Sequence, residues 1–98
     1  MSKVKYKIPA LGGDGAIHWG EIEGNLIDGT EGDLRFAVDY RGEDSVIGPW
    51  VATELNSGLM VCTGDSEEEV EVKIRTMMAD SESRWAVEEL IRRWTENG

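Results

Sequence analysis

The feature that most constrains the fold is a change of hydrophobic period at residue 65. Before it, apolar and polar residues alternate over short stretches, which is typical of half-buried strands. After it, Val70, Ile74, Met77 and Met78 recur at helical spacing. A chain with strands first and helices afterwards folds as an α+β domain, and its 98 residues suffice for a single hydrophobic core. We therefore treat residues 1–98 as one domain.

The amino-terminal part predicts a small antiparallel sheet of about five strands, arranged as a meander of hairpins. The first strand alternates lysines with apolar residues as far as Pro9, which either ends it or marks it as an edge strand. The alternation of the second strand slips at Gly20, which predicts a bulge that leaves Glu21 and Glu23 facing solvent. The expected strands are residues 3–8, 16–23, 34–41, 49–55 and 59–63, the last two joined by a turn at Asn56-Ser57-Gly58.

One or two helices are predicted at the carboxyl end, packed on one face of the sheet. Ser66 followed by Glu69 is a capping box, which marks the start of a helix at residues 66–79. A second apolar stripe is out of phase with the first, so the break falls within residues 80–83 and a second helix spans residues 82–96. This second stripe consists of Val87, Leu90, Ile91 and Trp94.

The charge of the chain is strongly negative and unevenly placed. The net charge is -10 and the isoelectric point is near 4.4. Residues 1–7 hold three lysines and no acid, residues 8–72 hold 15 acids against two arginines, and residues 73–98 hold five of each sign. This balance opposes direct binding to nucleic acid or to an anionic membrane, because both depend on basic residues. We expect one strongly negative side on the folded domain.

The sequence contains few of the side chains that catalysis and metal binding require. Cys62 is the only thiol and His18 the only imidazole, so zinc and haem sites lack their ligands, and we expect neither an enzyme nor a cofactor. The acidic stretch at residues 28–33 departs from the calcium-loop pattern, and the glycines at residues 12–15 lack the lysine of a phosphate-binding loop. A single cysteine and no apolar run of membrane-spanning length favour a cytoplasmic protein.

Acidic side chains and one tryptophan are the candidate partner-binding residues. We expect Trp19 and Trp50 to fill the core. Trp85 is out of phase with the second helical stripe, so a position in the core and a position at an interface are equally favoured for it. The candidate site is Glu21, Glu23, Asp28, Glu31, Asp33, Glu43, Asp44, Glu67, Glu68, Glu71 and Trp85.

Two resemblances suggest what such a surface does. Residues 34–78, with the junction Gly64-Asp65-Ser66-Glu67-Glu68-Glu69-Val70, are similar in outline to HicB-type antitoxins, although residues 80–98 accommodate only one helix and no evident DNA-binding tail. In size, charge and lack of catalytic residues, the chain looks like the small acidic proteins that phages use against host defences, including anti-CRISPR and anti-restriction proteins.

These features lead to one main hypothesis and two alternatives. The main hypothesis is a protein that inhibits a nucleic-acid-handling enzyme by placing a phosphate-mimicking acidic face in its basic groove. Its partner is then a basic nucleic-acid-binding protein or complex in the cytoplasm, the host cytoplasm if a phage encodes the chain. One alternative is an antitoxin that neutralises a basic RNA-cleaving toxin. The other is a phage assembly or scaffolding subunit that forms homo-oligomers, with a homodimer as the simplest case.

Overall fold

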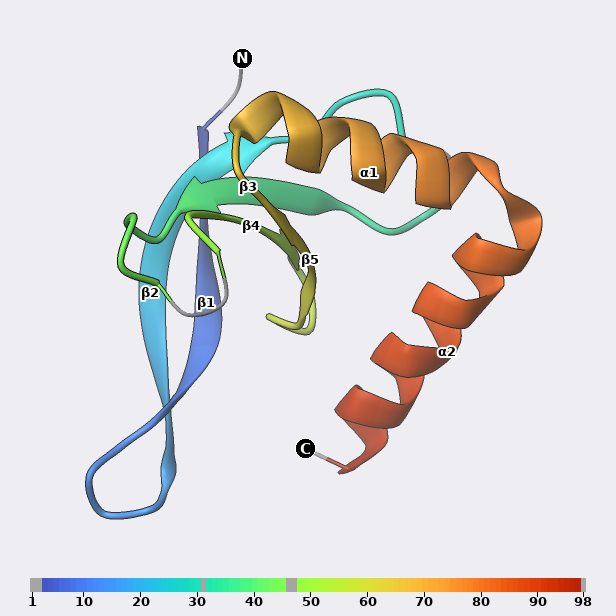
Figure 1. Ribbon diagram of the computed structural model, residues 1–98. Coiled ribbons are helices and arrows are strands. Elements are labelled where there is room, and N and C mark those ends of the chain that lie inside the picture. The colour runs from blue at the N-terminus through green and yellow to red at the C-terminus, as the bar shows by residue number, and fades with distance from the viewer. Residues whose placement is uncertain (1–2, 31, 46–47, 98) are drawn as a thin grey trace.

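Five antiparallel strands form one sheet, in which each strand lies beside its neighbours in the sequence (Figure 1). The computed structural model describes residues 3–30, 32–45 and 48–97. Two helices follow the sheet, so the α+β fold predicted from the sequence is confirmed. The elements are β1 (Lys3–Leu11), β2 (Ile17–Leu26), β3 (Phe36–Tyr40), β4 (Trp50–Glu54), β5 (Met60–Gly64), α1 (Glu67–Ala79) and α2 (Ser81–Asn97).

The β1–β2 hairpin is longer than predicted and has no bulge. β1 continues past Pro9, because an edge strand has one side without a partner and tolerates a residue that lacks an N–H. The predicted bulge at Gly20 is wrong, since the pairing of the two strands runs without a shift and places Ile8 opposite Gly20. The apparent slip in the sequence arises because apolar residues of β2 face solvent.

Trp19 is one of these exposed residues, and the prediction that it fills the core is wrong. In an unbroken strand it shares a face with Glu21 and Glu23, and 52% of its surface is exposed. The outer half of the hairpin extends beyond the other three strands (Figure 1), so the body of the protein leaves residues 13–21 exposed.

The inner half of the hairpin is fastened to β3 by a buried polar contact. The Tyr6 hydroxyl donates a hydrogen bond of 2.6 Å to Asp39 Oδ1, and Arg41 donates to the same carboxylate. Tyr6 reaches Asp39 across Gly24, where an added Cβ would lie 2.5 Å from the tyrosine oxygen and 2.6 Å from the carbonyl oxygen of Val38. Gly24 therefore provides the room that this contact needs.

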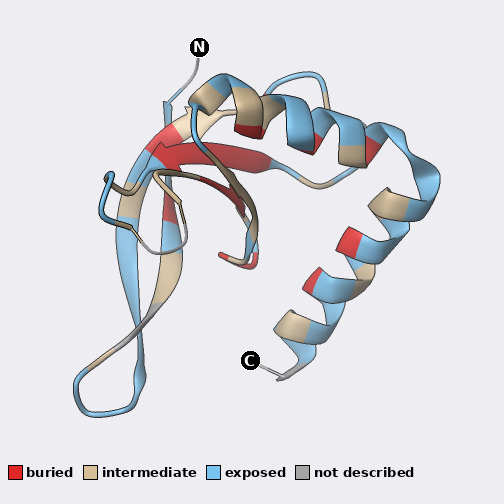
Figure 2. Cartoon of the chain, viewed as in Figure 1, coloured by how far each residue is buried: buried red, intermediate tan, exposed pale blue. Residues whose placement is uncertain are grey.

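The hydrophobic core lies between the two helices and the face of the sheet opposite the Tyr6–Asp39 contact. The apolar stripe of α1 is buried as predicted, and the buried residues of the helices face the strands in Figure 2. Leu90 is the exception, because 52% of its surface is exposed on α2, and its assignment to the buried stripe is wrong. The core consists of Ile27, Phe36, Val38, Ala52, Val70, Ile74, Met78, Val87 and Ile91.

One residue, Asp80, ends the first helix and begins the second. Its N–H donates to the carbonyl of Thr76 at 3.2 Å, which closes α1. Its carboxylate accepts hydrogen bonds from the backbone N–H and the hydroxyl of Ser83, which caps the start of α2. The predicted break within residues 80–83 is confirmed. Within the described ranges, no helix is both long and apolar enough to cross a lipid bilayer.

The β4–β5 turn is organised around a buried carboxylate. Glu54 is fully buried and accepts hydrogen bonds from the N–H groups of Asn56 and Ser57, each at 2.9 Å. Gly58 has a φ of +73°, and a Cβ there would lie 2.6 Å from a backbone carbonyl oxygen of β1. The indole N–H of Trp94 donates to the Ser57 carbonyl at 3.1 Å. The turn thus joins the sheet, the hairpin and the end of α2.

Candidate functional site

Two segments bring acidic residues together at one end of the sheet. Tyr40 lies opposite Trp50, and Trp50 lies opposite Gly64, so the β3–β4 loop and the β5–α1 junction leave the sheet at the same end. In these two segments Glu43, Asp44, Asp65 and Glu68 are exposed, whereas Glu67 and Glu69 are half-buried. We call this surface the acidic end; it consists of Glu43, Asp44, Asp65, Glu67 and Glu68.

The start of α1 holds this part of the surface in place. The Ser66 hydroxyl accepts a hydrogen bond from the N–H of Glu69 at 3.1 Å, so Ser66 caps α1 as predicted. The Glu69 carboxylate reaches back as in a capping box, but it accepts its hydrogen bond of 2.7 Å from the N–H of Asp65, one residue before the cap. The Asp65 N–H and the ammonium of Lys73 lower the pKa of Glu69. Negative charge is also favourable here because the helix dipole is positive at this end.

Glu67 is tied to the sheet as well as to the helix. Its Oε1 accepts a hydrogen bond of 3.1 Å from the side-chain amide of Asn25 on β2. Glu71, one turn further along α1, is half-buried. The acidic end is therefore attached to both layers of the fold.

Two of the other predicted acids lie opposite the basic strand. Glu21 is paired in register with Lys7 and Glu23 with Lys5, and the Lys3 ammonium lies 3.7 Å from the Glu23 carboxylate. The lysines that the sequence concentrates in residues 1–7 thus lie beside these two acids and partly offset their charge.

The acids of the β2–β3 loop lie beside the helices instead. The Asp28 carbonyl accepts a hydrogen bond of 2.8 Å from Arg75 on α1, and the aliphatic part of Arg84 lies next to Gly32. Asp33 is exposed on the same loop, and Glu31 lies outside the described residues. Nowhere in the ranges that the structure describes do three metal-binding side chains come together.

An aromatic pair that the sequence analysis did not select adjoins the acidic end. The rings of Tyr40 and Trp50 have centroids 5.1 Å apart and are tilted by 58°. Trp50 packs against the core, as predicted, whereas 53% of Tyr40 is exposed at the end of β3. Alternation placed Tyr40 on the inward face, and the turn residues Arg41 and Gly42 after it were the only sign that the strand ends there.

Trp85 is exposed on α2, so the core alternative is excluded for it and the interface alternative stays a prediction. Its surface is 66% exposed, and it borders a shallow hollow together with Ser81, Glu82 and Ala86. Trp85 and the acidic end lie on different elements, at the start of α2 and at the start of α1 respectively.

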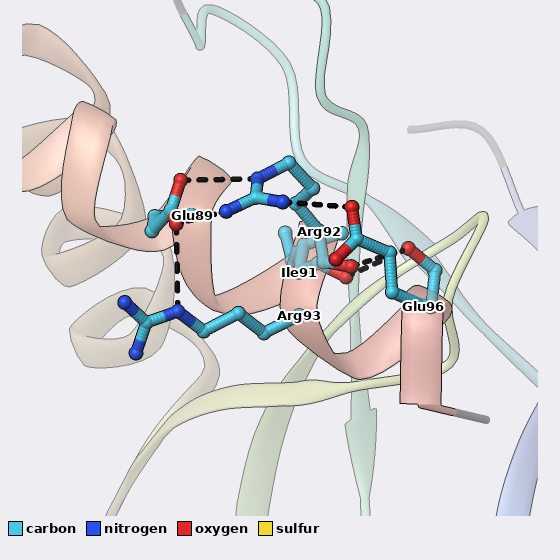
Figure 3. Close-up of polar contacts among 6 residues, drawn as sticks. Glu89, Ile91, Arg92, Arg93 and Glu96 are labelled. Carbon is cyan, nitrogen blue, oxygen red and sulfur yellow. Dashed lines mark hydrogen bonds and ion pairs between the residues drawn. The ribbon is translucent and has the colours of Figure 1, made fainter.

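The outer face of α2 carries arginines and glutamates that form ion pairs with one another. Arg92 bonds Glu89 and Glu96, and Arg93 lies 3.4 Å from Glu89 (Figure 3). The hydrogen bond from Arg92 is the main reason why the pKa of Glu89 is lowered. This arrangement agrees with the balanced charge of residues 73–98, since the two arginines and the two glutamates of this cluster cancel.

Cys62 and His18 do not form a catalytic pair. They lie on β5 and β2, which are not neighbours in the sheet. Cys62 is half-buried against the core, and burial raises the pKa of its thiol, which disfavours the nucleophilic thiolate. His18 is exposed and bonds Asp14 at 3.1 Å.

The fold and the site define a small α+β domain with an acidic end and an adjoining aromatic pair. Comparisons with protein-family models, with curated proteins and with solved structures find no match to this chain.

Proposed function

We propose that this protein inhibits a nucleic-acid-handling enzyme by binding it through the acidic end. The observation that carries the proposal is the position of Glu43, Asp44, Asp65, Glu67 and Glu68, which two loops bring to one end of the sheet. Such a surface complements a groove lined by lysine and arginine, so it both speeds encounter and excludes nucleic acid from the groove. We place this encounter in the cytoplasm, where the free Cys62 stays reduced.

The proposal requires that the location of the negative charge determines binding. Two variants that lose the same number of charges at different places test this requirement. The first variant, Glu43→Gln/Asp44→Asn/Glu68→Gln, removes three exposed charges from the acidic end. The second variant removes three exposed charges from α2 by Glu82→Gln/Glu88→Gln/Glu96→Gln. Both variants have the same net charge, so a difference between them does not come from the total charge of the protein.

The experiment first captures partners from a host lysate and then measures the purified pair. We expect capture at low salt to enrich nucleic-acid-binding proteins and to fade at high salt, since screening weakens exposed charges. Association of the purified partner should slow roughly tenfold for the acidic-end variant and less than about twofold for the α2 variant. Added DNA or RNA should compete with the protein for the partner.

Three outcomes would decide between this proposal and its competitors. Association that is indifferent to ionic strength, or a partner that binds nucleic acid and this protein together, contradicts the charge-mimic mechanism. A captured small basic ribonuclease, encoded by an adjacent short reading frame, assigns the same surface to an antitoxin instead.

A homo-oligomeric role is the second candidate, and the exposure of Trp85 and Leu90 on α2 favours it. The composition of β1 argues against pairing through that edge of the sheet. Its residues Lys3, Lys5, Lys7 and Pro9 discourage edge-to-edge contact. Light scattering over a wide concentration range tests this role. A monomer at every concentration excludes the homo-oligomeric role and is compatible with the inhibitor role.

A further inference from the structure

A hollow next to the acidic end combines aromatic rings with a carboxylate. It opens between the hairpin and the ends of β3 and β4, where α1 no longer covers the sheet, and it is lined in part by Lys3, Glu23, Asn25, Tyr40 and Trp50. Asn25 also holds Glu67 at 3.1 Å, so a second carboxylate lies at the rim.

The rings of this hollow suit a planar cation. Tyr40 is 53% exposed although its ring is fixed against Trp50, which leaves an ordered aromatic face open to a ligand. A guanidinium group stacks on such a face and is weakly hydrated, whereas an ammonium group is a compact and strongly hydrated charge. The rings therefore favour arginine over lysine.

The carboxylate of the hollow has only a weak internal partner. Lys3 lies 3.7 Å from Glu23, which is longer than a hydrogen bond, and both side chains are largely exposed. An exposed pair of this kind contributes little to stability. An incoming guanidinium can displace Lys3 and bind the carboxylate through two parallel N–H donors, which an ammonium cannot do.

We propose that this hollow recognises an arginine side chain of a basic protein partner in preference to lysine. This proposal rests on the proposed function, which supplies a partner with a basic groove. It adds that the groove presents an arginine to this hollow. Charge complementarity from Glu23 and Glu67 selects a cation, and the Tyr40–Trp50 pair selects its shape.

The test compares hexa-arginine with hexalysine, which have equal charge, by NMR titration of the full-length protein. We expect hexa-arginine to bind roughly threefold tighter, as cation–π attraction at an exposed site predicts. The largest shifts should fall on the Trp50 indole and on the end of β3. Equal affinities, or shifts centred on α2 or on the outer hairpin, overturn the proposal.

Four variants separate recognition from charge and from folding. Tyr40→Leu should keep the charge-driven binding and lose the preference for arginine, whereas Tyr40→Phe should retain most of it. Trp85→Leu, a matched change at an exposed ring on α2, should leave the preference intact. Lys3→Gln should raise the affinity for hexa-arginine by removing the competing cation. A Tyr40→Leu variant that is folded and still prefers arginine contradicts the proposal.

The two proposals fail in different ways. If the peptides show the arginine preference but no nucleic-acid-binding partner is captured, the proposed function is wrong and the arginine site stands. If such a partner is captured and inhibited while the peptides bind equally, only the arginine site is wrong.

Discussion

Removing the Tyr6–Asp39 hydrogen bond should lower the stability of the fold by a measurable amount. Tyr6 is 5% exposed and Asp39 6%, and their oxygens lie 2.6 Å apart. Tyr6→Phe keeps the ring and removes one hydrogen bond to a carboxylate, a contact that contributes about 1.5–3 kcal/mol. Because Arg41 still bonds Asp39, we expect a loss near the lower end, about 1.5 kcal/mol in the free energy of unfolding at neutral pH.

The loss should disappear in alkaline solution. Burial and the hydrogen bond to Asp39 raise the pKa of Tyr6 above its ordinary value of about 10. Above this pH the unfolded chain releases the phenol proton while the folded chain keeps it, so the stability of the original protein falls by up to about 1.4 kcal/mol per pH unit. Tyr6→Phe has no such proton. The two proteins should therefore be about equally stable near pH 11.

Urea denaturation followed by tryptophan fluorescence, repeated from about pH 7 to about pH 11, measures both effects. Tyr40→Phe is the control, since the Tyr40 side chain is exposed and the change should alter the free energy of unfolding by less than about 0.5 kcal/mol at neutral pH. A loss below about 0.5 kcal/mol for Tyr6→Phe at neutral pH, or a difference from the original protein that does not shrink in alkali, would refute the reasoning.

Three further substitutions test the fold in other places. Gly24→Ala should cost more than about 2 kcal/mol, because its Cβ would lie 2.6 Å from a β3 carbonyl oxygen, whereas Gly20→Ala, which meets nothing within 4 Å, should be neutral in a thermal melt. Glu54→Gln should cost about 1–3 kcal/mol in urea denaturation, since one turn N–H then faces an amide NH₂ group; a neutral result contradicts the role of the buried carboxylate. Ser66→Ala should cost about 1 kcal/mol by loss of the α1 cap, and unchanged stability would contradict that role.

The helices were the most predictable part of the chain, because their ends depend on local chemistry. The capping box of Ser66 and Glu69 marked the start of α1 to within one residue, and the polar cluster at residues 80–83 contained the residue that joins the helices, Asp80. Such caps act between residues three or four apart, so sequence alone can reveal them. The order of strands in the sheet needed the structure.

The errors have a common physical cause, which is that burial depends on neighbours distant in sequence. Apolar character assigned Trp19 and Leu90 to the core, but the part of the chain that the structure describes leaves about half of each side chain exposed. Asp39 and Glu54 show the converse, since both carry charged side chains and both are buried. Tyr6 and Arg41 satisfy one carboxylate and the turn amides satisfy the other, and partners of this kind remove most of the penalty of burial.

The same dependence on distant neighbours changes the meaning of the charge count. Of the 15 acids in residues 8–72, Asp39 and Glu54 are buried, and Glu21 and Glu23 lie opposite lysines. The acidic end lies where the β3–β4 loop and the β5–α1 junction leave the sheet, at a common end set by the register of Trp50 with Gly64. A count along the chain weights all these acids equally, but a basic groove contacts only those that lie together. Substitutions at the acidic end should therefore change association far more than an equal loss of charge elsewhere.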